Sequence, residues 1–306
     1  VDVLYVEQTG GYKVAFNDLT WPLVFDDDWR GAIDYVVVNP GSTTPAMLRN
    51  RYDSRVTYDL WGTAWVKMYT AVALRREYHG NMPVTVWYYA ETLLEIGPGS
   101  QPMPISHGST VWRFDPTYPD INDPQPELIA GGGDDAGEGV AGSEALVNEV
   151  AGIAVSGDGT VYFVEKQPRY PLQYPPVELL AHRVRRARKE GGVWWVETVA
   201  GTGHSGFDPQ AGELEPACGT QVPLRLPEDA DTGLLTMDPQ VQVLFIADTG
   251  NSRIRALNVS GDCGQQGQEA VLGQALGAGQ QVVLAPGQLV TVAGTGAWPS
   301  TASCPC

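Results

Sequence analysis

The stretch VLFIADTGNSRIRALN, residues 243 to 258, has the residue pattern of a β-hairpin. Residues 243–246 are β-branched or aromatic apart from one leucine, which favours a largely buried strand. Residues 248–251 tolerate the backbone dihedrals of a tight turn. After the turn, apolar Ile254 and Leu257 stand beside charged arginines, as expected of a strand with one face toward solvent.

The same pair of strands recurs along the chain. Moved back to residue 3, the stretch aligns without a gap on VLYVEQTGGYKVAFND, residues 3–18. Three further pairs have the same character with longer turns, and they are residues 33–41 with 54–62, 84–92 with 107–114, and 159–166 with 181–188. The sequence therefore predicts five hairpins built on one plan.

Two more short strands complete the repeated unit. A strand that ends in glycines closes several units, and its copies are ETVAGTG (197–203), VTVAGTG (290–296), the looser ELIAGGG (127–133) and, with its glycines lost, WVKMYTA (65–71). A further strand precedes the hairpin at residues 151–159 and 233–240. Four short antiparallel strands per unit, copied around the chain, predict an all-β fold, a β-propeller of five to six four-stranded blades.

Two long stretches resemble NHL repeats. They are AGTGHSGFDPQAGELEPACGTQVPLRLPED with the hairpin that follows it, and IAGGGDDAGEGVAGSEALVNEVAGIAVSGDGTVYFVEK with the strand after it. Both have the glycine turn, the loop and the acidic strand end of that family, and residues 182–185 fit its final arginine strand. The resemblance implies a propeller of usually six blades, most often used to bind protein, glycan or RNA, with lyase or hydrolase chemistry in some relatives.

We therefore expect residues 1–306 to form a single β-propeller. Residues 1–125 would be divergent blades, 126–296 NHL-like blades, and 297–306 a cysteine-containing tail. The chain is expected to open at Asp2 on the second strand of a blade, so that the inner strand of that blade is missing. Truncation, a divergent first unit, or completion of the blade edge by another subunit would each account for this, and the last would make the protein a polymer.

Composition limits the possible partners. The 306 residues are 43% hydrophobic, enough for a large core, and 36 glycines and 23 prolines suit short strands joined by tight turns. A net charge of −17 disfavours general binding to nucleic acid or anionic membranes. The sequence has no apolar run long enough to span a bilayer. It starts at Val1 without a signal peptide, which fits a processed leader or a piece of a longer chain.

The cysteines and one asparagine point to an exported protein. Cys218, Cys263, Cys304 and Cys306 lie in glycine- and proline-rich segments near the C-terminal end, and we expect them to form disulfides. A zinc site and free, buried thiols are the alternatives, although Cys304 and Cys306 lack the usual two-residue gap of a zinc knuckle. Asn258 begins an Asn-Val-Ser glycosylation pattern.

The sequence offers no catalytic, cofactor-binding or metal-binding residues. The repeat alignment puts His79, His107, His182 and His204 in turns or at strand starts, not at one repeated position. Calcium at the acidic turns 26–28 and 134–135 is a minor option, since neither has an alternating ligand spacing. The basic run 182–192 could contact phosphate as in RNA-binding relatives, but internal ion pairing is the better interpretation in an acidic protein.

The aromatic pairs 87–89 and 194–195 could stack on sugars, but strand geometry makes packing between blades the first expectation. Our hypothesis is a non-enzymatic, extracellular or surface-exposed binding module. Its partners would be proteins, including copies of itself, and not nucleic acid or the membrane interior. The alternative is a propeller hydrolase or lyase with a metal in the central channel, which would need three or more Glu, Asp, Asn or His side chains around one point.

Overall fold

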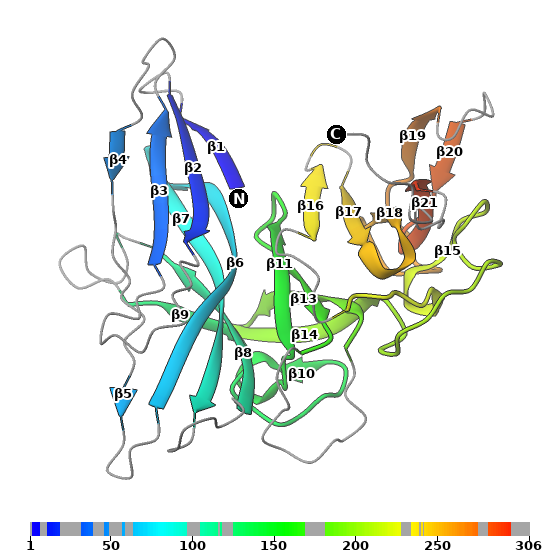
Figure 1. The fold of residues 1–306 in the computed structure, drawn as a ribbon. Coiled ribbons are helices and arrows are strands. Elements are labelled where there is room, and N and C mark those ends of the chain that lie inside the picture. Colours follow the sequence, from blue (N-terminus) through cyan, green and yellow to red (C-terminus); the bar gives the residue numbers. More distant parts are fainter. Residues whose placement is uncertain are drawn as a thin grey trace, which may run out of the picture.

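The computed structural model of this protein is built almost entirely from antiparallel strands (Figure 1). It describes residues 2–6, 11–18, 32–38, 46–48, 57–58, 64–96, 105–115, 117, 125–168, 181–227, 234–238, 240, 242–274 and 281–294, with side chains only from residue 70 onward. The described helices are three short 3-10 turns, η1 (Gly142–Glu144), η2 (Gly219–Gln221) and η3 (Thr249–Asn251). None of these is long and apolar enough to cross a membrane. The all-β prediction is confirmed.

The strands form four sheets and one separate hairpin. Sheet 1 has the order β1 (Asp2–Val6), β2 (Gly11–Asp18), β3 (Ala32–Val38), β4 (Ala46–Leu48). Sheet 2 has the order β5 (Thr57–Tyr58), β6 (Ala64–His79), β7 (Met82–Ile96), β8 (Ile105–Phe114), β9 (Glu127–Ala130). Sheet 3 has the order β10 (Val140–Ala141), β14 (Val193–Ala200), β13 (Arg183–Glu190), β12 (Val161–Lys166), β11 (Glu149–Val155). Sheet 4 has the order β15 (Ala217–Cys218), β21 (Gln288–Ala293), β18 (Arg253–Asn258), β17 (Val243–Asp248), β16 (Leu235–Asp238).

Sheets 3 and 4 follow the predicted unit closely. The predicted hairpins at 159–188 and 243–258 are β12–β13 and β17–β18, and the strands predicted before and after them are β11, β14, β16 and β21. Each sheet gains a two-residue fifth strand, β10 or β15, from the loop that precedes its inner strand. The hairpin of β19 (Ala270–Gln274) and β20 (Gln281–Leu284), inserted between β18 and β21, was not predicted.

The structure of the N-terminal half differs from two expectations. The predicted pairing of residues 33–41 with 54–62 is wrong, because β3 lies between β2 and β4. The strands β1 to β4 form a four-stranded sheet with β1 at its edge, so β1 is the first strand of this sheet and not the second strand, as expected. The pairing of 84–92 with 107–114 is confirmed as β7–β8.

The stretch 65–71 is also placed differently from the prediction. It does not close a preceding blade but forms the first half of β6, which pairs with β7 from Ala64 to His79. The physical reason is the turn after His79, where Gly80 has φ of +63° and Asn81 follows, a dipeptide suited to a two-residue hairpin. The 16 residues of β6 contain no glycine or proline, so nothing interrupts the strand before this turn.

The glycines that end the repeated strands are required by a close backbone approach. Gly131, Gly201 and Gly294 have φ between +87° and +98°. A Cβ atom on them would lie 2.1 to 2.3 Å from the carbonyl oxygen of Ser109, His182 or Ser252, which lies in the neighbouring strand or just before it. The residue after the closing strand therefore has to be glycine in all three sheets, which explains the repeated motif.

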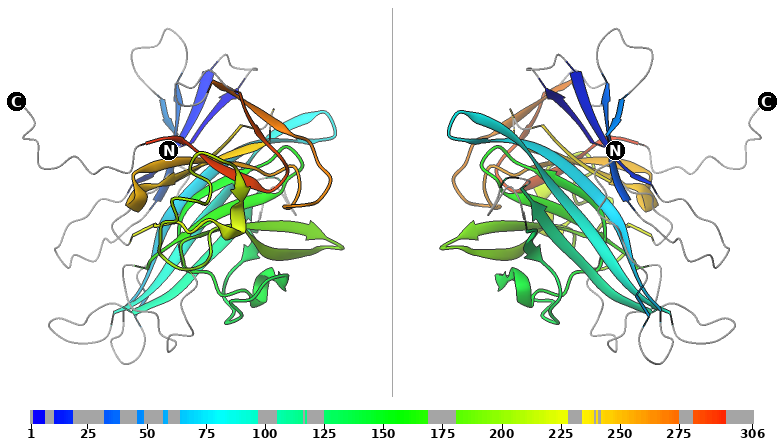
Figure 2. Two further views of the ribbon diagram at one scale, coloured as in Figure 1. Left: turned by 90° about the vertical axis from the view of Figure 1, so that its right-hand side faces the viewer. Right: turned by 90° about the vertical axis from the view of Figure 1, so that its left-hand side faces the viewer.

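The sheets stack in chain order as an open arc (Figures 1 and 2). Sheet 1 contacts β6, sheet 2 contacts β11 of sheet 3, and β11 contacts β16 of sheet 4. One apolar cluster that includes Tyr88, Ile129 and Phe163 joins sheets 2 and 3, and a second that includes Leu224, Leu244 and Leu257 joins sheets 3 and 4. The described sheets do not form a closed ring.

Candidate functional site

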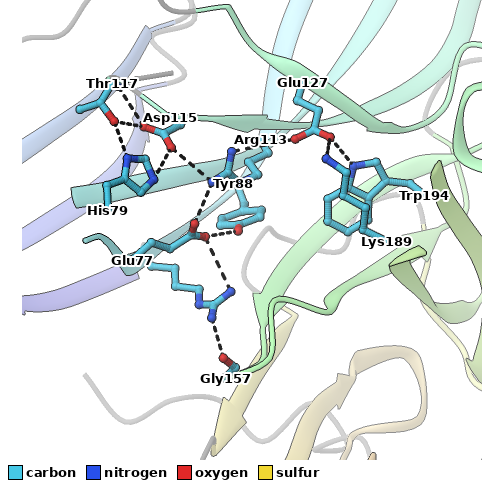
Figure 3. A network of polar contacts seen from close by, with 11 residues as sticks. Glu77, His79, Tyr88, Arg113, Asp115, Thr117, Glu127, Gly157, Lys189 and Trp194 are labelled. Carbon is cyan, nitrogen blue, oxygen red and sulfur yellow. Dashed lines mark hydrogen bonds and ion pairs between the residues drawn. The ribbon is translucent and has the colours of Figure 1, made fainter. Parts of the chain in front are cut away.

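A polar cleft of about 700 Å³ lies between sheets 2 and 3. It opens at the end of the sheets where the β6–β7, β11–β12 and β13–β14 turns meet, beyond the apolar cluster that joins the two sheets. Figure 3 shows its side chains converging from both sheets. Sheet 2 contributes Glu77, His79, Tyr88, Arg113, Asp115 and Glu127, and sheet 3 contributes Asp158, Gly159, Lys189 and Trp194.

Glu77 is the centre of the cleft's network. Its carboxylate accepts hydrogen bonds from the Tyr88 hydroxyl at 2.6 Å and from Arg113 Nη2 at 2.7 Å. Arg75 Nη1 lies 3.7 Å from the same carboxylate, and its Nη2 donates to the Gly157 carbonyl of the β11–β12 turn at 2.5 Å. Arg75 therefore links β6 of sheet 2 to the β11–β12 turn of sheet 3.

Asp115 forms a second group of contacts with His79 and Thr117. His79 Nε2 lies 3.0 Å from Asp115 Oδ2, and His79 Nδ1 lies 2.9 Å from Thr117 Oγ1. The Thr117 hydroxyl and amide both donate to Asp115 Oδ1, at 2.7 and 2.9 Å. Because the hydroxyl proton is directed at the carboxylate, His79 is not placed to remove it, and Thr117 is not an activated nucleophile here.

Glu127 connects the outer strands of the two sheets. Its carboxylate accepts hydrogen bonds from Trp194 Nε1, at 2.9 Å, and from the charged Lys189 Nζ. The Lys189 ammonium lies 5.6 Å from the centroid of the Trp194 ring, within range of a cation–π interaction. These contacts form one polar wall of the cleft (Figure 3).

The pKa values of three central groups are shifted away from neutral pH. Burial opposes ionisation of Glu77, but hydrogen bonds from Tyr88 and Arg113 outweigh it and hold the pKa of Glu77 below its usual value. Burial and the bond to Glu77 raise the pKa of Tyr88 to about 12. Burial also opposes charge on Asp115, yet the Thr117 hydrogen bonds outweigh it and lower the pKa of Asp115. A general acid or base needs a pKa near the working pH, so these groups suit ligand binding better than proton transfer.

The four histidines lie at separate places, although His79 ends β6 and His107 lies inside β8, not in turns or at strand starts as expected. His79 lines the cleft, His107 Nε2 lies 2.9 Å from Glu95, and His204 is exposed in a turn. His182 is buried, and its Nδ1 accepts a hydrogen bond from the Leu226 amide at 3.0 Å. Within the described part of the chain, no three His, Cys, Asp or Glu side chains are grouped so that they could hold a metal ion.

Three arginines of the basic run 182–192 form ion pairs inside the protein. Arg183 donates to Glu165 at 2.7 Å, and Arg186 donates to Glu197 at 2.5 Å and to Asp262 at 2.7 Å. The side chains of Arg183, Arg185 and Arg186 are almost fully buried. The prediction of internal ion pairing is confirmed for these three arginines.

Sheets 3 and 4 share one ion-pair arrangement. In sheet 4, Arg255 donates to Asp248 at the end of β17 and to the Gly212 carbonyl, at 3.0 and 3.1 Å. In sheet 3, Arg185 lies 3.8 Å from Glu165 at the corresponding strand end and donates to the Gly137 carbonyl at 2.7 Å. In each sheet, an arginine on β13 or β18 therefore bonds to the loop that precedes β11 or β16.

The aromatic pairs mostly serve packing. Trp87, Tyr88, Tyr89 and Trp194 are buried, whereas Trp195 is exposed on β14. Trp194 and Tyr88 line the cleft, and the Tyr88 hydroxyl donates a hydrogen bond to Glu77. The expectation that every second ring faces a neighbouring sheet agrees with this arrangement.

Cys218 and Cys263 form a disulfide with a Cα–Cα distance of 5.6 Å. The bond joins β15 to the loop after β18. Cys304 and Cys306, and the acidic turn 26–28, lie outside the described residues. In the other acidic turn, Asp135 accepts a hydrogen bond from the Gly137 amide at 2.8 Å, so this carboxylate stabilises its own turn.

Asn258 is fully buried at the end of β18. Its Nδ2 donates to the carbonyls of Gln268 and Leu284, each at 2.8 Å. Its Oδ1 accepts a hydrogen bond from the Ser260 amide at 2.9 Å. A glycan on this nitrogen is incompatible with these contacts, so the folded structure argues against the predicted glycosylation.

The sequence analysis did not single out Glu77, Arg113, Asp115 or Glu127. Glu77, Arg113 and Glu127 occupy ordinary positions on strands, and Asp115 directly follows β8. The strand pairing that brings them together was assigned incorrectly for β6. The Gly-Asn pair after His79 was the available signal, because a two-residue hairpin there pairs β6 with β7 and places Glu77 near Tyr88.

Comparison with known proteins gives a limited result. No protein-family model matches the chain, and no curated protein sequence matches it. Among solved structures, a structural genomics protein of unknown function from Bacteroides thetaiotaomicron VPI-5482 is 12% identical, with a TM-score of 0.31 over 80% of this chain. The chain spans 66% of the length of that protein.

Proposed function

We propose that this chain is a non-enzymatic β-propeller module of the NHL-repeat kind. It acts outside the cell or at its surface and binds proteins, including further copies of itself. The shared arginine arrangement of sheets 3 and 4 supports the relation to NHL repeats, because it uses the acidic strand end and the arginine strand of that motif. The Cys218–Cys263 disulfide supports export, since such bonds persist in oxidising compartments.

The cleft between sheets 2 and 3 supports binding over catalysis. Its charged side chains pair with side chains of opposite charge, as Glu77 does with Arg113 and Glu127 with Lys189. The pKa values of Glu77 and Asp115 are lowered, away from neutral pH. A preformed wall of this kind presents fixed donors and acceptors to a partner with little ordering cost.

Self-association is supported above all by the open arc. Each sheet inside the arc buries apolar faces against its neighbours, whereas sheet 1 and sheet 4 stand at opposite ends (Figure 1). A ring closes by packing its last sheet against its first, and the described sheets do not make this contact, so we propose that another copy packs there. Such contacts are head-to-tail and extend into chains.

The test is the mass of the purified protein across a concentration series, measured by analytical ultracentrifugation with and without reductant. We expect a reversible rise in mass with concentration, in both conditions, because the described disulfide lies within one chain. A protein that stays monomeric throughout would overturn the self-association.

A further inference from the structure

We infer that the cleft between sheets 2 and 3 binds a neutral, hydroxyl-rich ligand, a short oligosaccharide. This ligand lies beyond the protein partners proposed above, and its binding does not depend on self-association. The size of the cleft fits a small molecule. Its volume of about 700 Å³ lies within the range of about 300 to 1,000 Å³ that is typical of small-molecule sites.

The charge of the cleft opposes an anionic ligand. Four carboxylates line it against the two permanent cations of Arg113 and Lys189, and these carboxylates belong to Glu77, Asp115, Glu127 and Asp158. Arg75, which contacts Glu77, still leaves the carboxylates in excess. The whole chain also carries a net charge of −17, so the local and the overall charge both repel a phosphate or carboxylate.

The hydrogen bonds inside the cleft oppose a cationic ligand. Both carboxylate oxygens of Glu77, and both of Asp115, already contact neighbouring donors. The Asp158 carboxylate accepts hydrogen bonds from the Ser156 hydroxyl and the Thr160 amide of its own turn. A cation would have to displace these donors, and hydrogen bonds to charged groups are the strong ones.

Glu127 and Lys189 place an acceptor beside a donor on the wall of the cleft (Figure 3). Glu127 uses Oε1 for Trp194 and Lys189, whereas its Oε2 lies 3.9 Å from Arg113 Nη1, beyond hydrogen-bond distance. The Lys189 side chain is 43% exposed, and its ammonium group carries more donors than the bond to Glu127 uses. A ligand hydroxyl suits this pair because it donates and accepts at once.

Ion pairs that are complete within the protein favour a neutral polar ligand. The pairs of Glu77 with Arg113 and of Glu127 with Lys189 need no further charge, and they hold donors and acceptors in set places. The ring of Trp194 adds apolar surface to the lining. A sugar ring offers the matching groups, with hydroxyls around its edge and C–H groups on its faces.

The experiment compares the wild type with E127Q and with E95Q as the matched control. Glu95 is also paired with a base, His107, and 26% of its side chain is exposed against 33% for Glu127. It lies near the end of β7, away from the β6–β7 turn at which the cleft opens. Glutamine keeps the shape of the side chain, and thermal unfolding followed by circular dichroism checks that each variant folds.

An array of neutral oligosaccharides is the probe, with galacturonic acid trimers and glucosamine trimers as anionic and cationic probes of similar size. Titration calorimetry then measures each sugar that the array retains. We expect the wild type and E95Q to bind a neutral oligosaccharide with equal affinity, and E127Q to bind it about tenfold more weakly. K189M removes the neighbouring donor, so it should weaken binding too, and it replaces E127Q if that variant does not fold.

Several results would overturn this assignment of the cleft. Binding confined to the charged trimers would mean that net charge decides recognition, and a wild type that retains no neutral oligosaccharide would have no such site. Equal affinity in the wild type and in the folded cleft variants, or an equal loss in E95Q, would place the sugar elsewhere. Self-association is measured separately by ultracentrifugation, so either proposal can fail while the other stands.

Discussion

At the scale of single residues, the protein uses buried polar side chains to connect one sheet to the next. Arg186 on β13 reaches Asp262 in the loop after β18, and His182 accepts a hydrogen bond from Leu226, which lies between β15 and β16 of sheet 4. Breaking such a contact leaves a buried donor or acceptor unsatisfied, which costs more than an ordinary hydrogen bond contributes. These residues therefore add to the apolar cluster that joins sheets 3 and 4.

His182 makes one of these contacts dependent on pH. Burial lowers its pKa below the ordinary value of 6.5, and the nearby charges of Arg225 and His204 lower it further. The unfolded chain then binds a proton that the folded protein lacks, so this stability is present above pH 6.5 and is lost as the pH falls toward the folded pKa. We expect the wild type to lose free energy of unfolding between pH 7 and pH 5, by an amount approaching the roughly 1 kcal/mol of a hydrogen bond.

The matched variant for this measurement is H182N. Asparagine tolerates the φ of +53° at this position, and its side-chain oxygen can accept from the Leu226 amide without titrating. Urea unfolding at a series of pH values should show a smaller loss in H182N than in the wild type. Equal losses in the two proteins would contradict the role of His182.

At the scale of strands, local sequence predicted most of the sheets but not all of their partners. The hairpin β17–β18 could be predicted from its compact turn. The pair β12–β13 could be predicted from its likeness to that hairpin and from the repeated glycine motif, although residues 167–182 separate its two strands. The pairing of β6 could not be predicted from its apolar pattern, because alternation favours a strand without naming its neighbour. The cleft was missed for the same reason, since Glu77 and Arg113 become neighbours only when β6, β7 and β8 are paired in that order.

The edge strand β15 is held by a disulfide, whereas its counterpart β10 contains no cysteine. β15 is only two residues long, and Cys218 ties it to Cys263 across 45 residues of sequence. Closing a loop of that length removes entropy from the unfolded chain worth about 4 kcal/mol. We expect C218A/C263A to lower the free energy of unfolding in urea by about 2–4 kcal/mol, and reductant to affect only the wild type. An unchanged unfolding midpoint would show that the bond does not stabilise the fold.

At the scale of the whole molecule, shape and charge act against each other. The proposed self-association requires contact between copies of the chain, and the exposed side chains of Val271 and Val283 would favour such contact. The net charge of −17 opposes that contact, because every copy carries the same sign. The strength of the proposed self-association therefore depends on how far salt screens the repulsion between copies.

This balance predicts the response of self-association to salt. The Debye length falls from about 30 Å at 0.01 M to about 3 Å at 1 M ionic strength, so salt removes the repulsion while leaving an apolar interface intact. We expect the association constant to rise with sodium chloride at fixed protein concentration, and to rise again as the pH is lowered toward the isoelectric point near 4.5. Ultracentrifugation over a salt series measures this directly. Association that weakens with salt would contradict this expectation, because it would mean that oppositely charged patches hold the copies together.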